Sequence, residues 1–204
     1  ISNKLLCLLQ SISGFILMNF FHLCILLLLF SSSSVLSAKE KGGRISVGAG
    51  VYNFMENGDY ICRGAAGCDP ASGGANAAPY KNSSLAYNIE IFSSRNIFKY
   101  IKPFVGFMGT TDNASYSYVG LSGDLFFLNC KCLVITPSLA AGWYVDGDEI
   151  KLGHHVEFRS GGDISYKFKN NVRVGVGIFH ISNAMLGDRN PGSEQAILKY
   201  QVPF

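Results

Sequence analysis

Three residues near the C-terminal end of the chain carry side chains that together can hydrolyse an ester. His180 and Ser182 are separated by one residue, and Glu194 follows fourteen residues after the histidine. A serine hydroxyl becomes a nucleophile when a neighbouring imidazole takes its proton, and a carboxylate bound to the imidazole fixes its tautomer. If the fold brings the three together, they form a Ser/His/Glu triad for acyl transfer.

Both segments that carry these residues show the alternation of a β-strand, in which residues two apart share a face. The face that ends in His180 and Ser182 begins with Val172, Val174, Val176 and Ile178. The face that begins with Glu194 continues with Ala196, Leu198, Tyr200, Val202 and Phe204. If the two segments form a hairpin, Glu194 returns at the same end and on the same face as His180 and Ser182.

The loop between the two segments could complete such a site. It runs through residues 187–192, and either the Asn190 amide or a backbone N–H there could donate to the oxyanion of a tetrahedral intermediate. The alternative is a polar rim without chemistry, because His and Ser are common where a barrel wall meets the membrane interface.

No metal and no cofactor is predicted. His154 and His155 are adjacent and so point to opposite faces of a strand, which makes them a poor ligand set with Glu157. The acidic residues of loop 146–149 favour a solvated loop over a calcium site.

Composition indicates a β-rich domain whose surface does not all face water. The 204 residues are 15% charged and include 23 Gly, 10 Tyr and 15 Phe. The net charge of +3 is small, and no Lys/Arg cluster alternates with aromatic residues, so no nucleic-acid partner is predicted.

Eight segments read as strands separated by turn residues. They are 44–54, 85–92, 103–109, 116–128, 133–145, 155–168, 172–183 and 194–204. Brief connections alternate with longer ones, apart from a short third connection. This pattern is typical of an eight-stranded antiparallel outer-membrane β-barrel. A soluble sandwich or lipocalin-like barrel is the alternative, but it has no reason to place His and Ser on an apolar row. In the membrane barrel His180, Ser182 and Glu194 are predicted at the extracellular rim, facing lipid.

The first 38 residues read as a secretory signal peptide. Residues 20–30 are almost wholly apolar and lead into a Ser-rich run that ends at Ala38. We therefore predict removal of 1–38 and a barrel domain over 39–204, with a single membrane anchor over 5–30 as the alternative.

Four cysteines remain after that segment. Cys62 and Cys68 flank a short part of a Gly-rich loop and could form a disulfide in an oxidising compartment. Cys130 and Cys132 are separated by one residue, and direct pairing would be strained, so free or loosely paired thiols are predicted there.

The run Phe179-His-Ile-Ser-Asn183, followed by Asn190 and Glu194, resembles the lipid A 3-O-deacylase (PagL-type) family. That family has a Phe-His-x-Ser-Asn motif with an acidic partner fourteen residues after the His. The resemblance implies an outer-membrane barrel that removes the acyl chain at the 3 position of lipid A. Its partners would be lipopolysaccharide, which contains lipid A, and the other lipids of the outer membrane. It implies His180 as base, Ser182 as nucleophile, Glu194 as the carboxylate that orients the imidazole, and Asn190 in the oxyanion hole. Asn183 matches the motif without an assigned role.

Two further hypotheses stay open from the sequence. One is a non-enzymatic eight-stranded outer-membrane barrel with a structural or adhesive role, and the other is a relative that has lost or changed its activity. Whether the chain acts alone or as a homodimer is also open.

Overall fold

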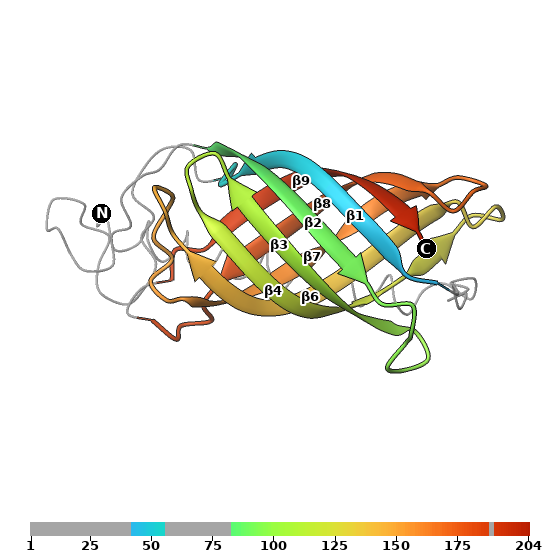
Figure 1. Ribbon diagram of the computed structural model, residues 1–204, viewed down its shortest axis with the longest axis horizontal. Coiled ribbons are helices and arrows are strands. Elements are labelled where there is room, and N and C mark those ends of the chain that lie inside the picture. The colour runs from blue at the N-terminus through green and yellow to red at the C-terminus, as the bar shows by residue number, and fades with distance from the viewer. Residues whose placement is uncertain (1–41, 56–82, 188–189) are drawn as a thin grey trace, which may run out of the picture. The chain divides into compact units, whose positions relative to one another are not determined.

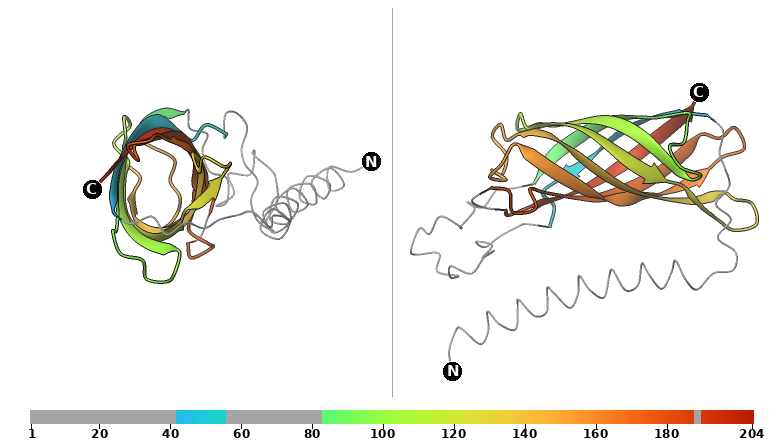
Figure 2. Two further views of the ribbon diagram at one scale, coloured as in Figure 1. Left: turned by 90° about the vertical axis from the view of Figure 1, so that its right-hand side faces the viewer. Right: turned by 90° about the horizontal axis from the view of Figure 1, so that it is seen from below.

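Nine strand segments of a computed structural model form one antiparallel sheet that closes on itself (Figures 1 and 2). The structure describes residues 42–55, 83–187 and 190–204, so the predicted signal peptide 1–38 and the Cys62/Cys68 loop lie outside the described residues. The strands are β1 Arg44–Tyr52, β2 Ser84–Phe92, β3 Ile101–Thr110, β4 Ser115–Gly123, β5 Leu125–Phe127, β6 Leu133–Val145, β7 Val156–Lys167, β8 Arg173–Ser182 and β9 Ser193–Pro203. The described residues contain no helix long and apolar enough to cross a membrane.

The nine segments make up the eight strands of the barrel. β1 pairs with both β2 and β9, which closes the sheet between the first and last strands. β4 and β5 both pair with β6 and follow one another across Asp124, so they are two parts of one strand. The predicted eight-stranded antiparallel barrel is therefore confirmed. The predicted strand 133–145 coincides with β6, whereas the predicted strand 116–128 is interrupted at Asp124.

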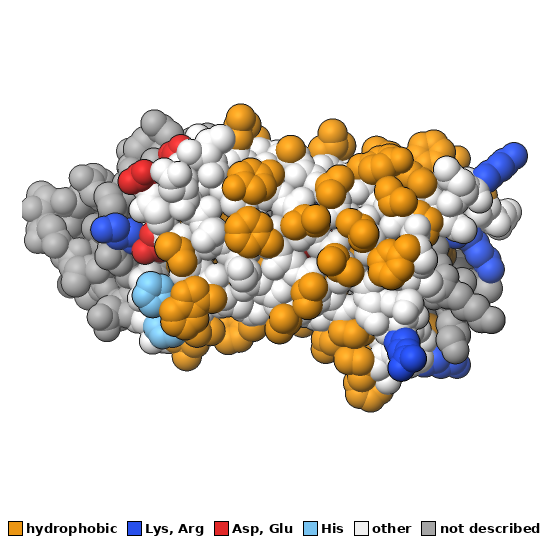
Figure 3. All heavy atoms as spheres, viewed as in Figure 1, with side chains coloured by type: hydrophobic (Ala, Val, Ile, Leu, Met, Phe, Trp, Pro, Cys, Tyr) orange, Lys and Arg blue, Asp and Glu red, His pale blue; other side chains and the backbone are white. Residues whose placement is uncertain are grey.

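Side chains alternate between the inner and the outer face of the wall. In β2, for example, every second residue is buried and the residues between are exposed. The exposed set is apolar: Leu85, Tyr87, Ile89 and Ile91. Figure 3 shows such apolar side chains along the whole visible length of the barrel wall. An outer surface of this kind suits contact with hydrocarbon rather than water.

The lumen is filled by aromatic and charged side chains. Near one end, Asp124 binds the guanidinium groups of Arg44 and Arg173, both at 3.0 Å, and we call these three residues the Asp124 cluster. Nearer the middle, Lys199 Nζ lies 2.6 Å from Glu90 and 2.9 Å from Asp163, and Arg159 lies 3.3 Å from Glu90. We call these four the Glu90 cluster. Buried charges of this kind need such partners, because their desolvation is costly.

The two ends of the barrel differ in their connections. One end, the turn end, has the connections 93–100, 128–132 and 168–172 and lies beside the C-terminus in Figure 1. The other, the loop end, has the connections 53–83, 111–114, 146–155 and 183–192. The loop end thus contains the C-terminal end of β8 and the start of β9, where the predicted site residues lie.

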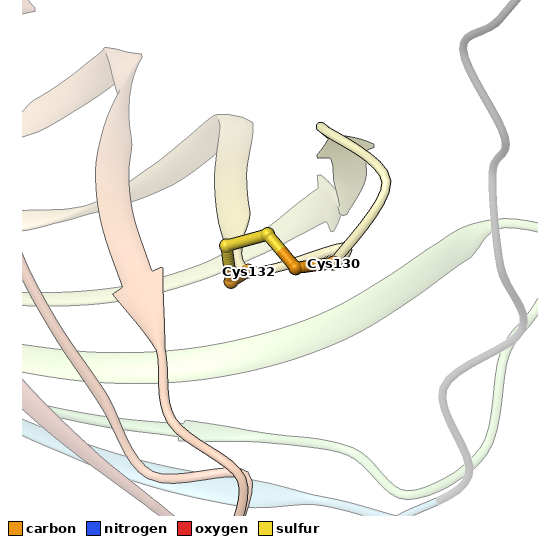
Figure 4. Close-up of a disulfide and its surroundings, with 2 residues drawn as sticks. All are labelled: Cys130 and Cys132. Atoms are coloured by element: carbon orange, nitrogen blue, oxygen red, sulfur yellow. A yellow bond between two sulfur atoms is a disulfide. The ribbon is translucent and has the colours of Figure 1, made fainter.

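The prediction of free or loosely paired thiols at Cys130 and Cys132 is wrong, because the two form a disulfide at the turn end (Figure 4). Their Cα atoms are 5.1 Å apart, within the range that a disulfide spans. Lys131 between them has a φ of 52°, and its N–H donates to the Leu128 carbonyl. This tight turn brings the two Cα atoms closer than the about 6.5–7 Å that separates residues two apart on an extended strand.

Candidate active site

A histidine and a glutamate meet on the outer face of the hairpin formed by β8 and β9. The register pairs His180 directly with Glu194. His180 Nδ1 lies 2.9 Å from Glu194 Oε1, and the two side chains are 36% and 16% exposed. Ile178, two residues before His180 on the same face, is 56% exposed on the barrel's outer wall. The side chains of this pair therefore lie on the outside of the sheet, as the alternation predicts.

The contact fixes which imidazole nitrogen carries a proton. A carboxylate accepts hydrogen bonds, so the nitrogen facing Glu194 is the N–H of the neutral ring. The other nitrogen, Nε2, then keeps its lone pair. An imidazole held in this tautomer can remove a proton from a hydroxyl presented to Nε2.

Ser182 lies beside the pair without a hydrogen bond to it. It is the last residue of β8, half-buried, and shares the outer face with His180. Residues two apart on a strand are about 6.5–7 Å apart at Cα. Among the described residues the Ser182 hydroxyl has no hydrogen-bond partner, so the structure joins two of the three predicted catalytic residues and leaves the third adjacent. Such contacts are often loose in a free enzyme and tighten when substrate binds.

The loop after β8 is organised by Asn183. Its backbone N–H donates to Asn190 Oδ1 at 2.9 Å, which leaves the Asn190 amide nitrogen available as a donor. The buried Asn183 side chain donates to the Leu152 carbonyl at 2.8 Å and accepts from the Met185 N–H at 2.9 Å. Ala184 and Met185 both have left-handed backbones, with φ of 52° and 66°. Asn183 therefore supports a strained loop and ties it to the β6–β7 connection.

Replacing Asn183 by Ala should lower the free energy of unfolding by about 1–3 kcal/mol, because the buried Leu152 carbonyl and the partly buried Met185 N–H lose their partner. We expect the β8–β9 loop to become more sensitive to protease. Urea unfolding of the refolded barrel and limited proteolysis measure both effects. Asn129→Ala, at an exposed turn position, is the matched control, and an equal loss there would contradict this role for Asn183.

Ser160 is a neighbour of the site that the sequence did not reveal. β7 pairs with β8 so that Ser160 lies directly opposite His180, on the side away from Glu194. It is exposed on the same outer face. Directly paired residues are closer at Cα than residues two apart on one strand. Its place depends on the register between β7 and β8, and no motif in the sequence indicates it.

The other candidate residues serve local structure. His155 stacks on Trp143 with ring centroids 4.9 Å apart, and His154 Nδ1 contacts the Val156 backbone. Glu149 accepts a hydrogen bond from Ser84. In the part of the chain that the structure describes, no group of three or more His, Cys, Asp or Glu could hold a metal ion.

Comparison with known protein families identifies the family of the chain. The sequence profile described as "Lipid A 3-O-deacylase (PagL)" matches residues 82–203, more than half of the chain. The chain belongs to this family. The PagL match spans β2 to β9 and includes the whole β8–β9 hairpin, so the resemblance predicted from the motif around His180 is confirmed. No curated protein sequence matches the chain.

Three solved structures are similar to the chain, and the first of them supports its fold. The crystal structure of the outer membrane enzyme PagL has a TM-score of 0.52 at 16% identity, covering 79% of this chain and 99% of that one. A de novo designed transmembrane β-barrel has a TM-score of 0.48 at 8% identity, covering 81% of this chain and 98% of the other. Neisserial surface protein A has a TM-score of 0.47 at 12% identity, covering 80% and 98%. The PagL profile and the PagL crystal structure together show that the protein is an outer-membrane β-barrel of the PagL family, as predicted.

Proposed function

We propose that this member of the PagL family hydrolyses the 3-O-linked acyl ester of lipid A, with Ser182 as nucleophile, His180 as base and Glu194 as the carboxylate that orients the base. The observation that carries the proposal is the 2.9 Å contact between His180 Nδ1 and Glu194 Oε1 on the outer face of the barrel. Glycerophospholipids and lipid A present their esters outside the barrel, so a hydrolase with an outward site can reach them without extracting a chain into the lumen.

The reaction follows from this geometry in two steps. Nε2 of His180 takes the Ser182 proton as Oγ attacks the ester carbonyl, and the Asn190 amide donates to the resulting oxyanion. The intermediate collapses as His180 returns the proton to the departing sugar oxygen, which leaves an acyl-serine. Water, deprotonated by His180, then attacks that ester, and His180 returns the proton to Ser182 Oγ as the fatty acid is released. Glu194 stabilises the imidazolium in both steps.

The place of the proposed site on the barrel supports this substrate. The outer row of β8 runs from Val174 and Val176, exposed on the wall, to His180 and Ser182 at the loop end. Longer loops face outward in bacterial barrels, so we assign the site to the extracellular rim, at the level of the outer leaflet. We also propose that residues 1–38 are a signal peptide and that residues 39–204 form the catalytic barrel.

Expression in a Gram-negative host followed by mass spectrometry of extracted lipid A tests the activity. The expected result is the loss of one hydroxyacyl mass from lipid A. Unchanged lipid A in cells that contain the folded barrel would favour a structural or adhesive role instead.

Glu194→Gln should reduce turnover by about 10⁴-fold, by comparison with loss of the acidic member in other serine hydrolases. The amide can donate to Nδ1, which favours the tautomer with the proton on Nε2, and it cannot stabilise the imidazolium. Initial rates on purified lipid A measure the effect. Glu194→Asp, which keeps the charge, should retain more activity than the Gln variant, and the reverse order would contradict the role given to Glu194.

A further inference from the structure

The connection between β2 and β3 differs from the other two turns at its end of the barrel. It spans residues 93–100, whereas the others span 128–132 and 168–172. Figures 1 and 2 show it, in green, extending sideways beyond the barrel wall. It is ordered by its own backbone: the Ile97 N–H donates to the Ile101 carbonyl at 2.9 Å and the Ile101 N–H donates to the Phe98 carbonyl at 3.3 Å.

This turn exposes large apolar side chains together with two cations. Ile97 is 58% exposed, Phe98 65% and Tyr100 40%. Arg95 and Lys99 are exposed beside them, and Lys99 Nζ lies 5.2 Å from the Tyr100 ring centroid. In Figure 3 apolar and basic side chains gather at the corresponding place. Apolar and aromatic side chains flanked by long cationic ones are typical of a segment at the boundary between hydrocarbon and headgroups.

Charge is distributed unequally between the two ends. The three turns of the turn end contain Arg95, Lys99, Lys131 and Lys169, and no Asp or Glu occurs in 93–100, 128–132 or 168–172. At the loop end, the described connections 111–114 and 146–155 contain Asp112, Asp146, Asp148 and Glu149 against Lys151. Anionic headgroups therefore complement the turn end and not the loop end.

We propose that the β2–β3 turn is a membrane anchor that inserts Ile97, Phe98 and Tyr100 into the leaflet at the turn end while Arg95 and Lys99 bind anionic phospholipid headgroups. The turn is continuous with the apolar outer wall, which already contacts lipid. An anchor at this end fixes the depth of the barrel and with it the height of the opposite end. Apolar insertion and headgroup attraction together hold a segment at a bilayer more firmly than either alone.

A tryptophan placed in the turn tests the insertion. Trp143 is the single tryptophan of the chain, so Phe98→Trp in a Trp143→Phe background reports from this position alone. In vesicles of phosphatidylcholine with one fifth phosphatidylglycerol, we expect blue-shifted emission and quenching by lipids brominated close to the headgroup. Lys169→Trp in the same background, in the shorter turn between β7 and β8, should emit as in water. An emission maximum at position 98 typical of tryptophan in water would overturn the proposal, whether the turn then lies in solvent or binds a protein. Tyr100→Trp gives the same test if the first variant does not fold.

The headgroup preference is tested with the same reporter. One set of vesicles contains brominated phosphatidylglycerol, and a second set contains the same amount of brominated phosphatidylcholine. The ratio of quenching in the two sets measures which headgroup is enriched near position 98. Each cation should enrich the anionic lipid about fivefold, and Arg95→Gln combined with Lys99→Gln should bring the ratio close to one. Equal quenching by both lipids, or a preference that survives the double substitution, would overturn anionic recognition. Neither measurement involves ester hydrolysis, so its outcome is independent of the proposed deacylase activity.

Discussion

Lipid A from cells that produce the Ser182→Ala variant should keep its full set of acyl chains. Loss of the nucleophile in serine hydrolases costs on the order of 10⁶-fold in turnover, because no acyl-enzyme forms and His180 has no hydroxyl to activate. Mass spectrometry of lipid A from matched cultures measures the result. Heat-modifiable migration of the barrel on a gel shows that the variant still folds, as expected for a half-buried residue at a strand end.

Ser160→Ala is the matched control for that experiment. Ser160 flanks His180 on β7, on the same outer face, and differs from Ser182 in lying directly opposite the imidazole rather than two residues along its strand. Activity that survives Ser160→Ala and disappears with Ser182→Ala assigns the nucleophile to β8. The opposite outcome would move the nucleophile to β7 and contradict the proposed triad.

Asp124→Ala should destabilise the barrel by about 3–5 kcal/mol, the usual cost of removing one member of a buried ion pair. The carboxylate lies between Arg44 and Arg173 and also accepts from the Thr136 hydroxyl at 2.8 Å. Its loss leaves two buried guanidinium groups without the charge that they share. It also removes the contact between β1, β8 and the junction of β4 with β5.

Urea unfolding of the barrel refolded in detergent measures this loss. Asp148→Ala is the control, since Asp148 is exposed and its bond to Asn113 is also exposed. Such surface contacts contribute about 1 kcal/mol or less. Equal destabilisation by the two substitutions would contradict the proposal that the buried ion pairs of Asp124 stabilise the barrel.

The barrel itself could be predicted from the sequence because strand alternation is a local property. The outward row of β8 and the return of Glu194 beside His180 follow from a hairpin, which joins strands that are neighbours in the chain. Ser160 was not found in this way, although β7 and β8 are also neighbours joined by a short turn, because no motif distinguishes one serine on a strand from the others. The partners inside the lumen are less local still: Arg44 and Asp124 lie 80 residues apart in the sequence.

The break in the strand 116–128 and the disulfide at Cys130 have a related cause. Alternation indicates which face a side chain occupies, but it assumes continuous extended backbone. At Asp124 the strand is interrupted where the carboxylate meets arginines from two other strands. At Lys131, between two predicted strands, the backbone is left-handed, and the Cα atoms of Cys130 and Cys132 are 5.1 Å apart. Each exception depends on local backbone geometry that residue types alone did not indicate.

The Glu90 cluster has a consequence for permeability. Its ion pairs join β2, β7 and β9 through the lumen, and Tyr118 from β4 donates to Glu90 at 2.9 Å. An ion entering from either side would have to displace charges already neutralised by their neighbours. We therefore expect no ion conductance through the protein in planar bilayer recordings. A cell can then carry many copies without raising the ion permeability of the membrane that contains them.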